Sequence, residues 1–321
     1  ADDAATIALL NPAAPFAPGN YPIEVVIQNL GIANLTDVNI YVNINDGVTD
    51  TTLPVFVHSP ILLNSLDRDT VTIGSYDFTS QSYTVTIFTS DPNGGTDANT
   101  ANDTLVVNLC LALPAGNYTI NSALPTGGGN YQSFNDVAAA LTCGILGDVV
   151  FTVAPGSGPY SEQVTFTHVP GVGPLATITF EGNGETLTHD GSIKYATVVL
   201  SEIDYVIFNN IILESTSAAQ GMAVQLNSEA DHNTFKNSTI RMSTTATNSS
   251  NAGINASASE TSASGDGNNA NYLWIDSCTF IGGYRGVDLQ GSSTILLKGN
   301  RITNSTFLYQ DENGVYVDDQ D

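Results

Sequence analysis

Basic residues are scarce in this chain: seven Lys and Arg stand against 32 Asp and Glu among 321 residues, a formal charge of −25. A field of this sign repels phosphate backbones and anionic lipid surfaces. The composition therefore argues against nucleic acid as a partner, and the charge helps an extracellular protein to stay in solution.

Long apolar runs are also missing. No stretch approaches the ~20 residues that cross a bilayer, and the start, ADDAATIALL, lacks the basic segment and apolar core of a signal peptide. We therefore expect no membrane insertion. We expect an exported protein, outside the cell or on its surface, with any signal peptide already removed.

The motifs of several enzyme classes are absent as well. The sequence has no glycine-rich phosphate loop, no nucleophile elbow and no Cys-x-x-Cys pair. Its four histidines lack metal-ligand spacing, which argues against zinc; they are His58, His168, His189 and His232. These patterns predict no cofactor.

Cysteines are few and odd in number: Cys110, Cys143 and Cys278. In an exported protein, two of them are expected to pair. Cys110 follows the last strand of the first half and Cys143 ends the one predicted helix, so we predict a disulfide between them. It would staple the domain junction and contribute about 3 kcal/mol. Cys278 lies inside a repeat and is predicted to be a buried free thiol.

The residues that are abundant favour strands and turns. Charged residues make up 12%, so Asn, Thr, Ser and Gly must cover much of the surface. Residues 1–109 alternate in period two with turn signals between short runs, which predicts an Ig-like β-sandwich of six or seven strands. The expected strands are IEVVIQNLG, VNIYVNINDG, LPVFVHS, DTVTIGSYDF, SYTVTIFTS and NDTLVVNL, with a hairpin turn at Asn45-Asp46-Gly47.

Residues 110–146 are predicted to form a junction with one short helix. Ser133 followed by Asp136 resembles a capping box, and Gly144 is expected to stop the helix. Its apolar face consists of Phe134, Val137, Ala138 and Leu141. A parallel β-helix exposes an apolar core and strand edges at its first rung, so a helix here would cap that end.

Residues 147–321 contain two recurring elements, which predict a right-handed parallel β-helix, incomplete at its C-terminal end. The first is FNNIIL from Phe208, FKNSTI from Phe235, IDSCTF from Ile275 and LKGNRI from Leu297. The second is GMAVQL from Gly221, GINASA from Gly253, GVDLQG from Gly286 and GVYVDD from Gly314. Between them, the low-complexity residues 244–271 are expected to loop out, either as a binding loop or as ordinary solvated chain.

Stacking these elements predicts which side chains share a row. The fourth position of the first element gives Ile211, Ser238, Cys278 and Asn300, and the second gives Asn209, Lys236, Asp276 and Lys298. The second row would be an outward ladder of alternating charge. The row through Asp288 would be Ala223, Asn255, Asp288 and Tyr316, also outward.

The strand ending in QNLG and the later YTVTIFTSDPNGGTDANTANDT make the first domain resemble CARDB-type Ig-like adhesion modules of bacterial surface proteins. In that resemblance, residues 97–104 form the turn into the final strand. The carboxylates of Asp97 and Asp103 are calcium candidates there, and capping of the turn is the alternative.

Residues 115–213, with SF…A…L, GPYSEQ and YVIFNNI, resemble the start of β-helix domains in large secreted proteins of Bacteroidota. The resemblance implies a longer parent chain exported by type IX secretion, and we expect this chain to be part of one. It also implies O-glycosylation at Asp-Ser/Thr sites, with Thr51, Thr70 and Thr104 as candidates.

Two functions follow as hypotheses. The first is a non-enzymatic module of a cell-surface protein, adhesive or structural in an extracellular assembly, with other surface proteins or glycans as partners. The second is a polysaccharide lyase or glycosidase on the β-helix wall, which needs clustered carboxylates and a base. Its candidate residues are Asp276, Asp288, Arg285 and Arg301.

Overall fold

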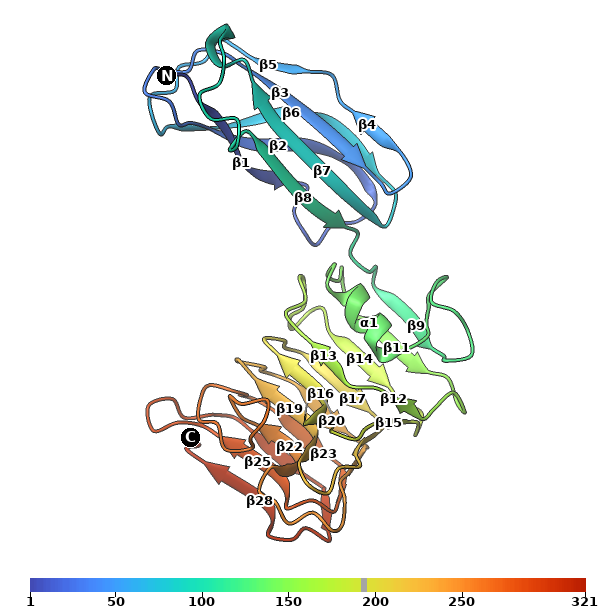
Figure 1. Cartoon of the computed structure of the whole chain (residues 1–321). Helices are drawn as coiled ribbons and strands as arrows, with labels where there is room; N and C mark the ends of the chain where they lie inside the picture. Colours follow the sequence, from blue (N-terminus) through green and yellow to red (C-terminus); the bar gives the residue numbers. More distant parts are fainter. Residues whose placement is uncertain (192–194) are drawn as a thin grey trace. The chain divides into compact units, whose positions relative to one another are not determined.

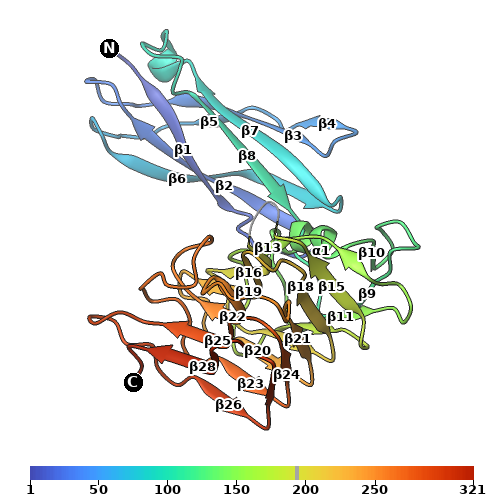
Figure 2. The ribbon, with the colours of Figure 1, turned by 60° about the horizontal axis from the view of Figure 1, so that its bottom comes forward.

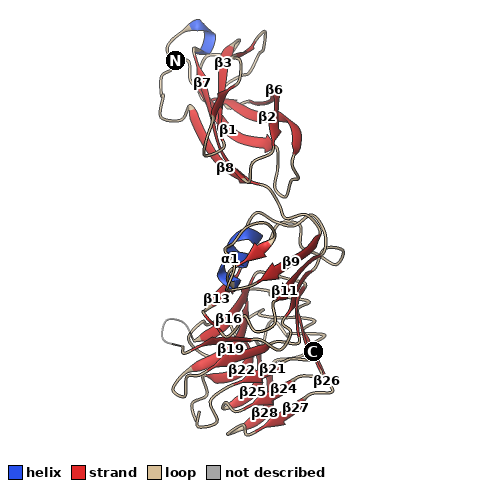
Figure 3. Cartoon of the chain, turned by 90° about the vertical axis from the view of Figure 1, so that its right-hand side faces the viewer, coloured by secondary structure: helices blue, strands red, loops and turns tan. Residues whose placement is uncertain are grey.

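The computed structural model describes residues 1–191 and 195–321, which form two compact units, Ala1–Ala112 and Leu113–Asp321. Strands dominate both units, as Figure 3 shows, which confirms the all-β prediction. The first unit ends three residues beyond the expected boundary at 109. None of the helices in the described part of the chain is long and apolar enough to span a membrane.

The first unit is a sandwich of two antiparallel sheets (Figure 1). One sheet contains β1 (Ala4–Asn11), β2 (Gly19–Asn29) and β6 (Arg68–Phe78). The other contains β4 (Asp50–Thr52), β3 (Val38–Asn45), β7 (Ser82–Ser90) and β8 (Thr104–Cys110), and β5 (Phe56–His58) also pairs with β3. Alternate side chains of these strands form one apolar core, as period-two strands require.

The six predicted strands are all present, and the structure adds β1 and β4. The strand β1 lacks clean alternation because its pairing with β2 shifts register twice, between Thr6 and Ala8 and between Leu9 and Asn11. The predicted turn at Asn45–Gly47 is present: Asp46 Oδ1 accepts hydrogen bonds from the backbone N–H groups of Val48 and Thr49. A short 3₁₀ helix, η1 (Pro92–Gly94), follows β7.

The second unit is a parallel β-helix with three walls, called sheets I, II and III (Figures 1 and 2). Sheet I contains β10 (Asn130–Tyr131), β9 (Gly116–Ile120), β11 (Val149–Val153), β14 (Ile178–Glu181), β17 (Val206–Asn209), β20 (Thr234–Lys236), β23 (Trp274–Asp276) and β26 (Arg301–Thr303). Sheet II contains β12 (Tyr160–Ser161), β15 (Thr186–His189), β18 (Ile212–Ser215), β21 (Thr239–Arg241), β24 (Thr279–Ile281) and β27 (Thr306–Leu308). Sheet III contains β13 (Val164–Phe166), β16 (Ala196–Ser201), β19 (Gly221–Asn227), β22 (Asn251–Ala256), β25 (Arg285–Gln290) and β28 (Asn313–Asp318).

Identical side chains stack in the interior of the β-helix. Phe151, Phe180, Phe208 and Phe235 form one column of sheet I, with ring centroids 5.4, 4.9 and 5.3 Å apart and nearly parallel planes. All four rings are fully buried. Offset stacking of buried aromatic rings adds about 0.5–1.5 kcal/mol per pair to the burial of their area, so the column fixes the vertical register of the rungs.

The last copy of the first repeat has a different register from the predicted one. Ile275 pairs with Ile302, and Phe280 pairs with Phe307, so the fourth copy is ITNSTF from Ile302 rather than LKGNRI from Leu297. The fourth position therefore reads Ile211, Ser238, Cys278 and Ser305. The prediction of Asn300 in that row, and of Lys298 in the charged row, was wrong.

The third position of the repeat explains why it needs Asn or a small residue. Asn210, Asn237, Ser277 and Asn304 all have φ between 51° and 54°. A positive φ costs little for Gly, which has no Cβ, and for Asn and Asp, whose short polar side chains can bond to the local backbone. Each of these residues lets the chain turn from sheet I to sheet II.

The second repeat also shifts at its first copy. Gly253, Gly286 and Gly314 stack as predicted, but Gly221 pairs with Asn251, two residues out of the predicted register. The row through Asp288 therefore begins with Gln225 rather than Ala223.

The single α-helix of the described residues, α1 (Phe134–Leu141), begins as predicted at Ser133, whose Oγ accepts a hydrogen bond from the N–H of Asp136. The Asp136 carboxylate accepts from Thr126 instead of closing a capping box. The N–H groups of Phe134 and Asn135 donate to the carboxylate of Glu162, 2.9 and 3.1 Å away. The buried face of the helix joins the core of the β-helix, as a cap of its first rung requires.

Candidate functional site

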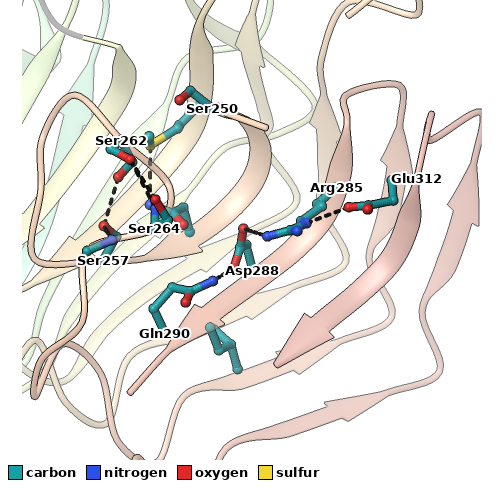
Figure 4. A network of polar contacts seen from close by, with 12 residues as sticks. Ser250, Ser257, Ser262, Ser264, Arg285, Asp288, Gln290 and Glu312 are labelled. Atoms are coloured by element: carbon teal, nitrogen blue, oxygen red, sulfur yellow. Dashed lines mark hydrogen bonds and ion pairs between the residues drawn. The ribbon is translucent and has the colours of Figure 1, made fainter. Parts of the chain in front are cut away.

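The two candidates Arg285 and Asp288 lie side by side on the outer face of β25. Arg285 Nη1 is 2.8 Å from Asp288 Oδ2, and Arg285 Nε is 3.0 Å from the carboxylate of Glu312 (Figure 4). Gln290 Nε2 donates to the other oxygen of Asp288 at 2.5 Å. The guanidinium also lies 3.7 Å from the ring centroid of Tyr316 on the next rung. The outer face of sheet III therefore holds a satisfied ion-pair network.

Two members of this network, Arg285 and Asp288, are buried although they lie on the outer face of the wall. The side chain of Asp288 is 0% exposed and that of Arg285 is 13% exposed. Burial raises the pKa of the Asp288 carboxyl, while the hydrogen bonds from Arg285 and Gln290 oppose that rise. Breaking such a pair leaves an uncompensated buried charge, which is costly.

The low-complexity segment packs on sheet III instead of looping out. Ser257 Oγ donates to the carbonyl of Ser262 and accepts from the N–H of Gly265, folding residues 257–265 back on themselves (Figure 4). Asn269 donates to the carbonyl of Gln290, which joins the segment to β25. Ala263 is buried against Val199 and Met222 in a small second core.

The other two candidates, Asp276 and Arg301, lie on sheet I. Asp276 Oδ1 accepts hydrogen bonds from Thr303 at 2.5 Å and from Asn304 at 2.9 Å, and these bonds lower the pKa of its carboxyl. The guanidinium of Arg301 is 4.6 Å from the ring centroid of Trp274. The four residues thus fall into two groups on different walls, each group engaged by side chains of its own or the next rung.

Three aromatic rings on the β-helix surface are stacked on one another. Tyr205, His232 and Tyr272 form a column at the turn into sheet I, with ring centroids 4.8 and 4.6 Å apart. All three residues have φ near 55°. A sugar binds an aromatic ring through its face, and in this column the facing sides are occupied by neighbouring rings.

The two calcium candidates of the sandwich differ in their surroundings. Both oxygens of Asp97 accept backbone hydrogen bonds, from Ala4 at 2.9 Å and from Asn99 at 2.7 Å, as a turn cap does. Asp103 is 7% exposed, and its Oδ1 has no hydrogen-bond partner among the described residues. Burial, followed by the charges of Asp97 and Asp3, raises the pKa of Asp103 to about 6.

Cys278 is a buried free cysteine, as predicted, and burial raises its pKa to about 11. Cys110 and Cys143 are disulfide-bonded cysteines; that they pair with each other stays a prediction. Among the glycosylation candidates, Thr70 and Thr104 are exposed and Thr51 is half-buried, and their modification stays a prediction.

No protein-family model matches the chain, and no curated protein sequence matches it either. Among solved structures, the chain is similar to the CARDB domain of a Pyrococcus furiosus protein in complex with di-metal ions, at 16% identity and a TM-score of 0.28, over 35% of this chain and 89% of that one. It is also similar to a domain of a Methanosarcina acetivorans protein whose name assigns it to the cell surface, at 22% identity and a TM-score of 0.25, over 34% of this chain and 91% of that one.

Proposed function

We propose that the chain is a non-catalytic module of an exported cell-surface protein, structural or adhesive in an extracellular assembly. The observation that supports the proposal is the set of side-chain bonds that Asp276, Arg285 and Asp288 make within the walls. Each is bonded to side chains of its own or the next rung, and Asp288 is fully buried. The bond from Thr303 to Asp276 and the ion pair of Arg285 with Glu312 join one rung to the next, and Asp288 holds Arg285 in place, as a structural wall requires.

The chemistry of a polysaccharide lyase asks for a different arrangement. It needs carboxylates on adjacent rungs to hold calcium beside the substrate, and a base facing the same groove. Here the row of Asp288 contains Gln225, Asn255 and Tyr316, and the guanidinium nearest to Asp288 is held by two carboxylates. An arginine held in this way is a poor base because both bonds favour its charged form.

Export is the second part of the proposal. Disulfides persist in oxidising compartments such as the cell exterior, and Cys110 and Cys143 are disulfide-bonded. The excess of 32 Asp and Glu over seven Lys and Arg suits a surface-exposed protein in solution. Type IX secretion and a bacterial surface as the destination remain implications of the resemblance described above.

The test is a pair of assays on the full chain, each with calcium and with chelator. Uronate-lyase turnover is followed on polygalacturonate, and binding is followed on a glycan array. The proposal expects no turnover above that of an Asp288→Ala variant. Turnover that the Asp276→Ala or Asp288→Ala change abolishes would overturn it, and saturable binding without turnover would identify the adhesive form of the proposal.

A further inference from the structure

We propose that the N-terminal sandwich binds a divalent cation of the calcium type between the start of β1 and the loop before β8. Asp103 and Asn102 supply the direct side-chain oxygens, and the carboxylates of Asp3 and Asp97 complete the negative surroundings. This site is independent of the role proposed for the β-helix.

These residues are far apart in the sequence of the first unit, and backbone and side-chain contacts bring them together. The N–H of Ala4 donates to Asp97 Oδ2 at 2.9 Å, and Asn102 Nδ2 donates to Asp3 Oδ1 at 3.1 Å. The N–H of Ala98 donates to the carbonyl of Asp2 at 2.9 Å. In Figure 2 the N-terminus lies beside η1, at the same end of the sandwich.

Two buried oxygens at this place lack a partner within residues 1–191 and 195–321. They are Asp103 Oδ1 and Asn102 Oδ1. A buried carboxylate oxygen without a partner destabilises the folded protein. Asp3 and Asp97 lie close enough to Asp103 for their charges to act on it, which adds to that cost. A bound cation removes both penalties at once.

The charge of the unit favours the same ligand. Arg68 is the one basic side chain of Lys or Arg type in residues 1–112, against twelve Asp and Glu. Uncompensated negative charge of this size draws cations to the unit.

The ligand set matches calcium better than other metals. Calcium takes six to eight oxygens at flexible geometry, including amide carbonyls and waters, whereas zinc prefers Cys and His. Among the described residues, no group of three or more His, Cys, Asp or Glu is arranged to hold a metal by itself. The Asn102 amide and bound waters are therefore needed to complete the shell.

Calcium binding is tested by titration calorimetry on the full chain after removal of metal with chelator, in about 0.15 M salt to screen diffuse binding. The matched variants are Asp103→Asn, which keeps the shape of the side chain, and Asp77→Asn. Asp77 is an exposed carboxylate of β6, so its loss removes the same charge from the same unit. Circular dichroism checks that both variants fold.

We expect one saturable calcium site in the native chain and in Asp77→Asn, and at least tenfold weaker binding in Asp103→Asn. Hydrogen exchange of residues 1–11 and 96–104 should slow with calcium in the native chain. No saturable site in the native chain, or equal calcium affinity in Asp103→Asn and the native chain, would overturn the proposal.

Discussion

At the scale of single residues, two side chains cap the N-terminus of the helix α1. The Ser133 cap was predictable because its partner, the N–H of Asp136, lies three residues away in sequence. The second cap, Glu162, was not predictable, because it reaches the helix from the connection between β12 and β13 and no local pattern marks it. Long-range side-chain partners of this kind leave no signal in a single sequence.

The cap by Glu162 leads to a prediction about the end of the β-helix. Glu162→Gln keeps an acceptor but removes the charge beside the helix N-terminus, so the free energy of unfolding should fall by about 0.5–1 kcal/mol. Chemical denaturation measures the change. Glu202→Gln, an exposed site on the same unit, serves as the control and should leave the midpoint unchanged.

The raised pKa of Asp103 predicts the pH dependence of the sandwich without metal. Its folded value of about 6 exceeds the ordinary value of 3.8, so the folded state binds the proton more tightly than the unfolded state. Stability from this group is present below pH 3.8 and is lost as the pH rises through 6. In chelator, the native chain should therefore be more stable at pH 5 than at pH 7.

Asp46 and Asp91 do not disturb this comparison, because hydrogen bonds lower the pKa of each, so both stay ionised at pH 5. Urea denaturation at the two pH values measures the effect. The Asp103→Asn variant should show a smaller difference between pH 5 and pH 7. An equal difference in both chains would mean that another group is responsible.

At the scale of elements, the strands of both units were predictable from alternation, whereas register was predictable only in part. The copies at Phe208, Phe235 and Ile275 align as predicted because an aromatic or branched apolar residue begins each. The fourth copy was misplaced because both LKGNRI and ITNSTF fit the pattern, and only the second puts Phe307 against Phe280. The packing of one rung on the next therefore determines which of the two segments takes the fourth position.

Burial of sheet III was missed for a related reason. Its strand β25 was predicted to have an outward polar row, yet Asp288 and Gln290 are buried. The segment that packs on this sheet and bonds to the backbone of Gln290 is rich in Ser, Ala and Gly, a composition that also describes solvated loops. Sequence alone therefore identified Arg285 and Asp288 as notable residues but not their mutual ion pair.

The phenylalanine column predicts where the β-helix is least tolerant of substitution. Phe208→Ala opens a cavity between Phe180 and Phe235, so the free energy of unfolding should fall by about 3–5 kcal/mol. Leu175→Ala, at a side chain 93% exposed, should change it by less than about 0.5 kcal/mol. Equal denaturation midpoints for the two variants would contradict this packing account.

At the scale of the whole molecule, the cysteines predict one covalent pattern. Mass spectrometry of an unreduced digest should yield a peptide pair that joins Cys110 to Cys143. Cys278 should react with a thiol reagent only after unfolding, because it is buried and its pKa is about 11. A cross-linked Cys278, or its rapid labelling in the native chain, would contradict this pattern.

The central claim is that the polar residues of the walls hold the rungs together and take no part in catalysis. Groups placed for catalysis often cost stability, so their removal tends to leave a protein equally or more stable. The most direct measurement is therefore the melting temperature of the β-helix unit in Asp276→Ala, Arg285→Ala and Asp288→Ala, each in the full chain. The account predicts a lower melting temperature in all three, and an unchanged or higher value in Arg285→Ala or Asp288→Ala would contradict it.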